Sequence, residues 1–97
     1  MSTTADIIVA EILKYVSNDQ FSNWYVGIAK DVENRLFTDH NVDKLNSQWI
    51  YDEAINSQHA RSAEESLINS GFDGGTSGGD NQTTFVYAYR KTSNTRE

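Results

Sequence analysis

The chain has 97 residues and no cysteine, and its eight lysine and arginine residues face fourteen aspartate and glutamate residues, giving a formal net charge of −6. This length allows one small domain with a single core, and 37% hydrophobic residues are typical of a folded protein. The composition excludes a disulfide framework and a cysteine-based zinc site, predicts neither a membrane-spanning helix nor a signal peptide, and favours a cytoplasmic protein.

The N-terminal half alternates helical and strand patterns. Helical spacing predicts a helix over residues 6–17, with Thr4 as its cap. The apolar residues that carry this spacing are Val9, Ile12, Leu13 and Val16. A strand is expected over about 23–28, and a second helix over about 32–39, with Asp31 as its cap.

The C-terminal half continues the alternation. Residues 48–54 form an aromatic strand pattern, and a third helix begins at Asn56 or Ser57 and ends at Gly71, a typical C-terminal cap. The clearest strand is 84–90, TFVYAYR, with its aromatic residues on one side. The sequence therefore predicts the α+β class, as a small three-stranded, mainly antiparallel sheet packed with three helices.

Three segments read as irregular. Residues 1–4 and 92–97 are polar, and we expect flexible tails on a single domain of residues 1–97. Residues 73–83, DGGTSGGDNQT, contain four glycines and are expected to form a flexible linker between helix and strand.

Reactive side chains gather where the first strand meets the second helix. Tyr25 precedes Gly27, which allows another group to approach the backbone closely, and Arg35 and His40 follow on the helix. A tyrosine, an arginine and a histidine so placed suit phosphate chemistry. Each also has an ordinary structural interpretation: a packed aromatic, a surface ion pair with Asp39, and a contact with the last helix carbonyls.

Glu64 and Glu65 are expected to face opposite ways. At about 100° per residue, Glu64 falls among the apolar positions of the third helix, whereas Glu65 falls on the solvent side near Arg61. A buried carboxylate is costly without a partner, and a metal or an arginine would offset that cost. The alternative is a boundary glutamate that reaches water.

These residues resemble the GIY-YIG nuclease family. The Y-[IV]-G strand corresponds to Tyr25–Gly27, followed by a polar turn and a helix with Arg35 ten residues after the tyrosine. Glu64 to Ile68 fits E-x-x-L-I, the pattern of the family's metal-binding glutamate. The resemblance covers roughly residues 24–70.

The resemblance implies a divalent-metal-dependent nuclease. It implies one Mg²⁺ or Mn²⁺ on Glu64, Tyr25 near the attacking water, Arg35 on the scissile phosphate and His40 assisting proton transfer. The auxiliary positions that we add are Gly27, Lys30, Tyr87 and Tyr89.

Family members also begin with a G-I-Y strand. This sequence has no G-I-Y motif, and residues 6–17, which precede the Y-V-G strand, have the periodicity of a helix. The Y-V-G strand needs a neighbour for its N–H and C=O groups. We therefore predict that 84–90 pairs beside 23–28 and that Tyr87 or Tyr89 lies near Tyr25.

Two functions remain open at this point. The first is metal-dependent cleavage of DNA, with weak affinity for DNA alone because the net charge is −6. The second is a non-catalytic module on the same scaffold, of viral or mobile-element origin, which binds a protein partner through its acidic surface.

Overall fold

A mixed four-stranded sheet with the order β2-β4-β1-β3 forms the centre of the structure. The computed structural model describes residues 3–75 and 82–96. β4 (Phe85–Arg90) pairs antiparallel with both β1 (Trp24–Ala29) and β2 (Trp49–Glu53), and β3 (Asp73–Gly74) pairs parallel with β1. The α+β class is confirmed, but the expected sheet of three strands lacked the short parallel strand β3.

The prediction of a flexible linker over 73–83 is wrong for the two residues of β3, while residues 76–81 lie outside the described part. Gly71 has φ 123°, a left-handed conformation that turns the chain back toward β1 after α2 (Ser57–Ser70). A Cβ at Gly74 would lie 2.8 Å from the Val26 carbonyl oxygen. Glycine thus lets the chain pass this close to β1.

The expected helices are present at nearly the expected positions. They are α1 (Ala5–Tyr15), η2 (Asn34–Asp39) and α2, and a short 3₁₀ turn, η1 (Phe21–Asn23), precedes β1. The Asp31 carboxylate accepts the Asn34 N–H at 3.2 Å, as expected of a cap. η2 has π geometry, and the His40 N–H donates to the Arg35 carbonyl, five residues earlier. None of the helices in residues 3–75 and 82–96 is long and apolar enough to cross a membrane.

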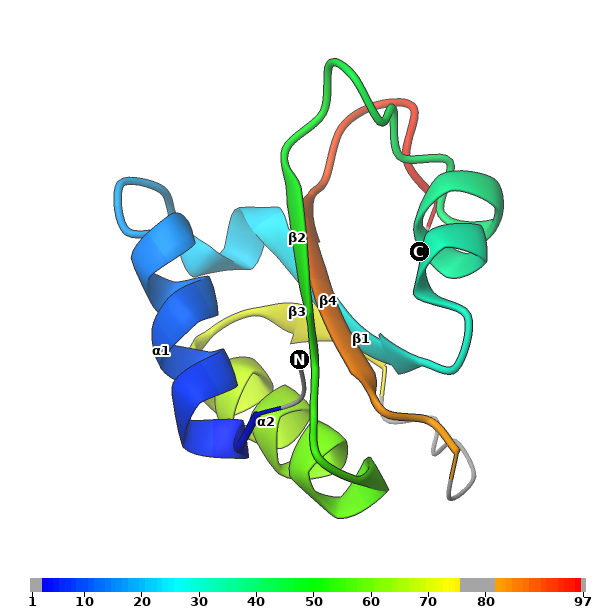
Figure 1. The fold of residues 1–97 in the computed structure, drawn as a ribbon. Helices are drawn as coiled ribbons and strands as arrows, with labels where there is room; N and C mark the ends of the chain where they lie inside the picture. The colour runs from blue at the N-terminus through cyan, green and yellow to red at the C-terminus, as the bar shows by residue number, and fades with distance from the viewer. Residues whose placement is uncertain (1–2, 76–81, 97) are drawn as a thin grey trace.

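Side chains that alternate along the central strands pack on opposite faces of the sheet. Figure 1 shows α1 and α2 on one face, with η2 and the C-terminal end of the chain on the other. The buried residues on the α1–α2 face include Ile8, Ile12, Trp24, Val26, Leu67, Val86 and Ala88. The buried residues on the η2 face are Ala29, Val32, Leu36, Val42, Tyr87 and Tyr89.

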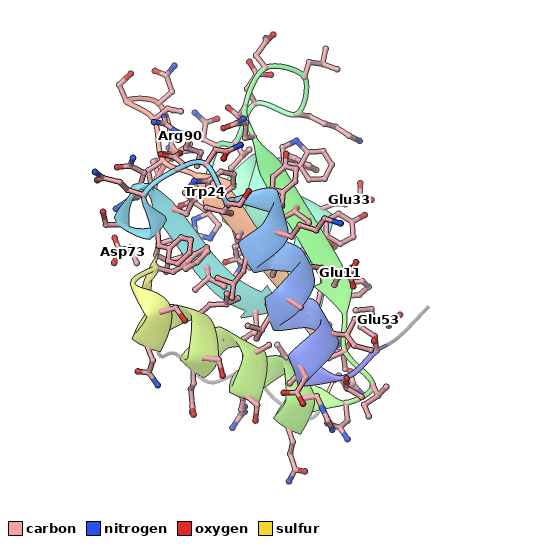
Figure 2. The ribbon with its side chains drawn as sticks, turned by 90° about the vertical axis from the view of Figure 1, so that its left-hand side faces the viewer. Glu11, Trp24, Glu33, Glu53, Asp73 and Arg90 are labelled. Atoms are coloured by element: carbon pink, nitrogen blue, oxygen red, sulfur yellow. The ribbon has the colours of Figure 1, made fainter. Side chains whose placement is uncertain are left out.

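Hydrogen bonds to Asp19 hold the turn after α1 against the sheet. Its carboxylate accepts hydrogen bonds from Arg90 Nε at 2.7 Å, from Asn23 Nδ2 at 3.0 Å and from Trp24 Nε1 at 3.0 Å. Trp24 and Arg90 lie at the same end of the molecule in Figure 2. The Arg90 guanidinium, with Asn23 and Trp24, holds the pKa of the Asp19 carboxyl well below its usual range.

The start of α1 is capped differently from the prediction. Thr4 occupies the N-cap position, but its side chain makes no capping hydrogen bond. Instead the Ala5 N–H donates to His59 Nδ1 at 3.0 Å. His59, from the first turn of α2, therefore joins the two helices.

Both ends of the chain were expected to be flexible tails, yet their described residues form backbone hydrogen bonds. The Thr3 N–H donates to the Glu53 carbonyl, and the Ile55 N–H donates to the Thr3 carbonyl, both at 2.9 Å. The Arg96 N–H donates to the His40 carbonyl at 2.8 Å. The C-terminal residues therefore reach the end of η2.

Candidate active site

Three tyrosines and a histidine meet on the η2 face of the sheet. Tyr87 and Tyr89 lie on β4, Tyr25 lies on β1, and His40 follows η2. The centroid of the His40 ring lies 5.2 Å from that of Tyr25, 5.4 Å from that of Tyr87 and 5.0 Å from that of Tyr89. We call these four residues the tyrosine–histidine cluster. It unites four predicted site residues from three segments that are far apart in the sequence.

The pairing of β4 with β1 assembles this cluster. Tyr89 is the Cα partner of Tyr25, and Tyr87 is the partner of Gly27. The ring centroids of Tyr25 and Tyr89 are 5.5 Å apart. The predictions that 84–90 pairs beside 23–28, and that one of its tyrosines lies near Tyr25, are both confirmed.

Gly27 makes room for the Tyr87 ring. A Cβ at Gly27 would lie 2.5 Å from Tyr87 Cζ, and closer still to the hydroxyl oxygen. Real Cβ atoms essentially never come so close. The expectation that Gly27 allows a close approach is confirmed, and the approaching group is the phenol of Tyr87.

The His40 ring is held by hydrogen bonds at both nitrogens. Nδ1 lies 2.5 Å from the Arg96 carbonyl oxygen, and Nε2 lies 2.7 Å from the Tyr87 hydroxyl. A carbonyl can only accept, so Nδ1 carries a proton, and in the neutral ring Nε2 then accepts from the Tyr87 O–H. The Tyr89 hydroxyl lies 3.1 Å from Nδ1 and donates to the Arg96 carbonyl at 3.3 Å. These contacts fix the orientation and the tautomer of His40.

The Tyr87 phenol stays protonated at neutral pH. Its side chain is buried, and burial raises the pKa of the hydroxyl; the charge of Tyr25 adds to the effect, that of Arg35 opposes it, and Glu64 and Asp39 add smaller increases. Tyr87 is therefore a hydrogen-bond donor to His40 rather than a phenolate. The buried position of Tyr87 and His40, 2% and 5% exposed, keeps both from bulk water.

Tyr25 is the tyrosine of the cluster that reaches the surface. Its side chain is partly exposed, whereas those of Tyr87 and Tyr89 are buried. A Cβ at Gly75 would lie 3.2 Å from the Tyr25 hydroxyl, so the chain after β3 passes close to this oxygen. Among the three tyrosines, Tyr25 is the one whose side chain is not buried.

Arg35 lies beside the cluster on η2. Its Nε forms an ion pair with the Asp39 carboxylate at 3.3 Å, and both side chains are about half exposed. The ordinary interpretation of Arg35 as a surface ion pair is thus realised. Its charge nevertheless acts on the Tyr87 hydroxyl, which places Arg35 in the electrostatic environment of the cluster. A surface pair of this kind is weak, so a phosphate can compete for the guanidinium.

Glu64 faces the interior and Glu65 faces solvent, as the helical spacing predicts. Glu64 is 6% exposed, and no group in the described residues donates a hydrogen bond to its carboxylate. Burial, followed by the charge of Glu65, raises the pKa of Glu64 from 4.5 to about 7, while Arg61 opposes the change. A nearby cation would favour the ionised form.

Among the described residues, Glu64 offers a cation no more than a single carboxylate ligand. Residues 3–75 and 82–96 contain no group of three or more histidine, aspartate or glutamate side chains placed to hold a metal ion. Mg²⁺ commonly keeps several waters and binds one or two carboxylates together with substrate phosphates. Glu64 alone therefore suits Mg²⁺ bound with a phosphate better than a closed structural site.

Lys30 is not brought to the tyrosine–histidine cluster. It follows β1 and is exposed at the rim of a separate hollow, which Tyr51 and Phe85 also line. Sequence reasoning also missed the Arg96 carbonyl, which orients His40. A backbone oxygen in a polar C-terminal segment carries no pattern that would have predicted this contact.

Comparisons with known proteins add no relative. No known protein family matches the chain, and no curated protein or solved structure matches it. The candidate active site therefore rests on its residues and their contacts.

Proposed function

We propose that this chain is a cytoplasmic endonuclease that cleaves DNA phosphodiester bonds with the help of Mg²⁺ or Mn²⁺. The observation that supports it best is the tyrosine–histidine cluster, in which β1, β4 and the residue after η2 bring four side chains together on one face of the sheet. Glu64 lies on α2, which covers the other face, and influences the cluster through its charge alone. Tyr25 and His40 pack at the Tyr87–Tyr89 pair, and the charges of Arg35 and Glu64 both act on the Tyr87 hydroxyl.

Each residue has a role that its position allows. Arg35 is half exposed and binds the scissile phosphate, exchanging its weak pair with Asp39 for a charge-assisted contact. Tyr25 is the partly exposed tyrosine of the cluster and orients the attacking water. His40 packs against the Tyr25 ring and positions that phenol, and it can assist proton transfer only by exchanging the hydrogen bond between its Nε2 and Tyr87. A cation on Glu64 would neutralise charge that develops on the phosphate.

The β4 strand supplies the tyrosines that complete this arrangement. It pairs with β1 where the family's G-I-Y strand is expected, so the absence of that motif does not leave the Y-V-G strand unpaired. Affinity for long DNA is expected to be weak, because Arg35, Arg90 and Lys91 form ion pairs within the described part of a chain that has only eight cationic side chains.

The test is cleavage of a labelled DNA duplex with Mg²⁺, with Mn²⁺ and with a chelator. Glu64→Gln should lower cleavage by about 100-fold or more while the protein remains folded. Glu65→Gln is the matched control, since it removes the same charge one residue away on the solvent side, and its activity should be unchanged. Equal losses in the two variants, or full activity of Glu64→Gln, would overturn the proposal.

The second candidate function is a non-catalytic module that binds a protein partner. The observation that favours it is a set of glutamates around the edge strand β2: Glu53 is on β2, Glu11 is on α1 and Glu33 precedes η2, and the three lie toward the same side of the molecule in Figure 2. Asp52 on β2 also has a raised pKa, because of burial and the charge of Glu11. Charges along an edge strand also prevent pairing with other sheets, which is the ordinary interpretation of this surface.

The two candidates are separated by different variants. For a binding module, Tyr25→Phe and Arg35→Ala should leave the biological activity unchanged, whereas Glu11→Lys with Glu53→Lys should disrupt a protein complex. A pull-down that recovers only nucleic acid would contradict the binding module.

A further inference from the structure

The hollow that Lys30, Tyr51 and Phe85 line lies next to the tyrosine–histidine cluster, on the same face of the sheet. It has a volume of about 510 Å³ and lies between the chain that joins β1 to η2, the middle of β2 and the first residue of β4. We call it the aromatic hollow, and it is lined by Lys30, Asp31, Val32, Glu33, Tyr51 and Phe85.

Aromatic rings form the floor of the hollow and continue along β2. Tyr51 and Phe85 meet edge to face with centroids 5.9 Å apart, and Trp49 stacks on Tyr51 at 6.0 Å with 12° between the ring planes. All three side chains are partly exposed. These rings also pack against the core of the η2 face. Proteins that bind single strands stack bases on such partly exposed rings, together with cationic side chains that hold the backbone.

The hollow is close to the candidate active site. Tyr51 is the Cα partner of Tyr87, which is itself the partner of Gly27. Neighbouring strands lie about 4.8 Å apart, so the backbone of Tyr51 is about 10 Å from that of Gly27. A base in the hollow would therefore belong to a nucleotide near the phosphate at the cluster.

The rim carries both signs of charge. Lys30 is exposed and makes no ion pair or hydrogen bond with another described residue, which leaves its ammonium available for a phosphate. Asp31 and Glu33 lie beside it, and Glu33 Oε2 is 3.5 Å from the Tyr51 hydroxyl, a weak contact. Carboxylates accept hydrogen bonds from the amino group of cytosine.

We propose that the aromatic hollow binds an unpaired base of the DNA substrate. This inference rests on the proposed function in taking DNA as the ligand. The base stacks against Tyr51 and Phe85, Lys30 contacts the adjoining phosphate, and Glu33 accepts from an amino group of the base. The hollow therefore prefers cytosine to thymine and single-stranded DNA to a closed duplex.

The test measures binding in a chelator, so that no cleavage is needed. Fluorescence anisotropy of a labelled eight-residue oligodeoxycytidine at low salt gives the dissociation constant. Tyr51→Leu keeps an apolar side chain but removes the ring, and should weaken binding about 5- to 150-fold, the equivalent of one stacked base. Tyr51→Phe should bind like the unmodified protein. Lys30→Ala should weaken binding and reduce its salt dependence.

The matched control is Tyr15→Leu, because Tyr15 is a half-exposed tyrosine on α1, at the other face of the sheet. It should leave the dissociation constant unchanged, and thermal unfolding of each variant checks that it is folded. An equal loss in Tyr15→Leu, unchanged binding in Tyr51→Leu, equal binding of oligothymidine, or no binding by the unmodified protein would each overturn the inference.

The experiment also separates this inference from the proposed function. If Glu64→Gln and the unmodified protein bind the oligonucleotide equally, and neither cleaves DNA with a metal, the result supports base binding in the hollow and contradicts the proposed nuclease activity. If the unmodified protein cleaves DNA while Tyr51→Leu binds and cleaves DNA normally, the result supports the proposed nuclease activity and contradicts base binding in the hollow.

Discussion

Replacing Glu64 by glutamine should stabilise the folded protein above neutral pH. The carboxyl has a pKa of about 7 in the folded chain because it is buried, against an ordinary value of 4.5. The folded state thus holds a proton more tightly than the unfolded state between these two values. The free energy of unfolding must therefore fall as pH rises from about 4.5 to about 7, and then level off.

The size of the effect follows from the two pKa values. Each pKa unit corresponds to about 1.36 kcal/mol, so ionising Glu64 in the folded state costs at most about 3 kcal/mol. Glutamine has the same shape and no charge, and it should be more stable than glutamate by up to this amount at pH 8. Below about pH 4.5 the carboxyl is neutral in both states, and the two proteins should unfold with nearly the same free energy.

Urea unfolding followed by tryptophan fluorescence, from pH 4.5 to pH 8, measures this difference. Glu65→Gln is the control, since Glu65 is exposed, and it should show no comparable gain. Mg²⁺ adds a second readout at pH 8. If the ion binds at Glu64, ten times its dissociation constant should stabilise the unmodified protein by about 1.4 kcal/mol and leave Glu64→Gln unchanged.

The reasoning is refuted if Glu64→Gln is no more stable than the unmodified protein at pH 8. It is also refuted if the difference persists unchanged at pH 4.5. Groups common to both proteins, such as Asp52 and the two histidines, cancel in the comparison. The difference therefore reports on Glu64 rather than on acid unfolding in general.

Two further predictions concern the contacts that hold the sheet together. Gly27→Ala should lower the free energy of unfolding by about 1–3 kcal/mol, because its Cβ would collide with Tyr87, and a urea-measured loss below about 0.5 kcal/mol would contradict this packing. Asp19→Asn should be less stable than the unmodified protein at neutral pH, because it weakens the pair with Arg90. Since the folded pKa of Asp19 is lowered, that difference should shrink as pH falls below about 4, and an unchanged difference at pH 3 would count against the assignment.

The elements that the sequence predicted correctly are those with local signals. α1 carries apolar residues at helical spacing, and α2 begins at Asn56, whose side chain accepts the His59 N–H, and ends at Gly71 with a positive φ. β3 has no such signal, because two residues cannot show an alternation. The pairing of β3 with β1 depends on the position of the chain at the end of α2, and that position is set by how α2 packs on the sheet.

The same distinction applies to the candidate site. The inward position of Glu64 followed from its angle on the helix, and the position of Tyr89 beside Tyr25 followed from the need to pair β1. The contact between His40 and the Arg96 carbonyl followed from neither, since it joins a side chain to a distant backbone oxygen. Such contacts are decided by how a terminal segment packs, after the core has formed.

The candidate site also shows that the same arrangement of side chains on a sheet can be built from strands that come in a different order in the sequence. A strand beside β1 needs to satisfy the backbone groups of β1 and to present the correct side chains in register, and either end of the chain can supply it. Here a strand from the C-terminal end places Tyr87 opposite Gly27, the position where an absent Cβ leaves room for a phenol. A shift of one residue in this register would turn Tyr87 and Tyr89 to the α1–α2 face, away from His40. The contact between Gly27 and Tyr87 therefore favours the one register in which the tyrosine–histidine cluster exists.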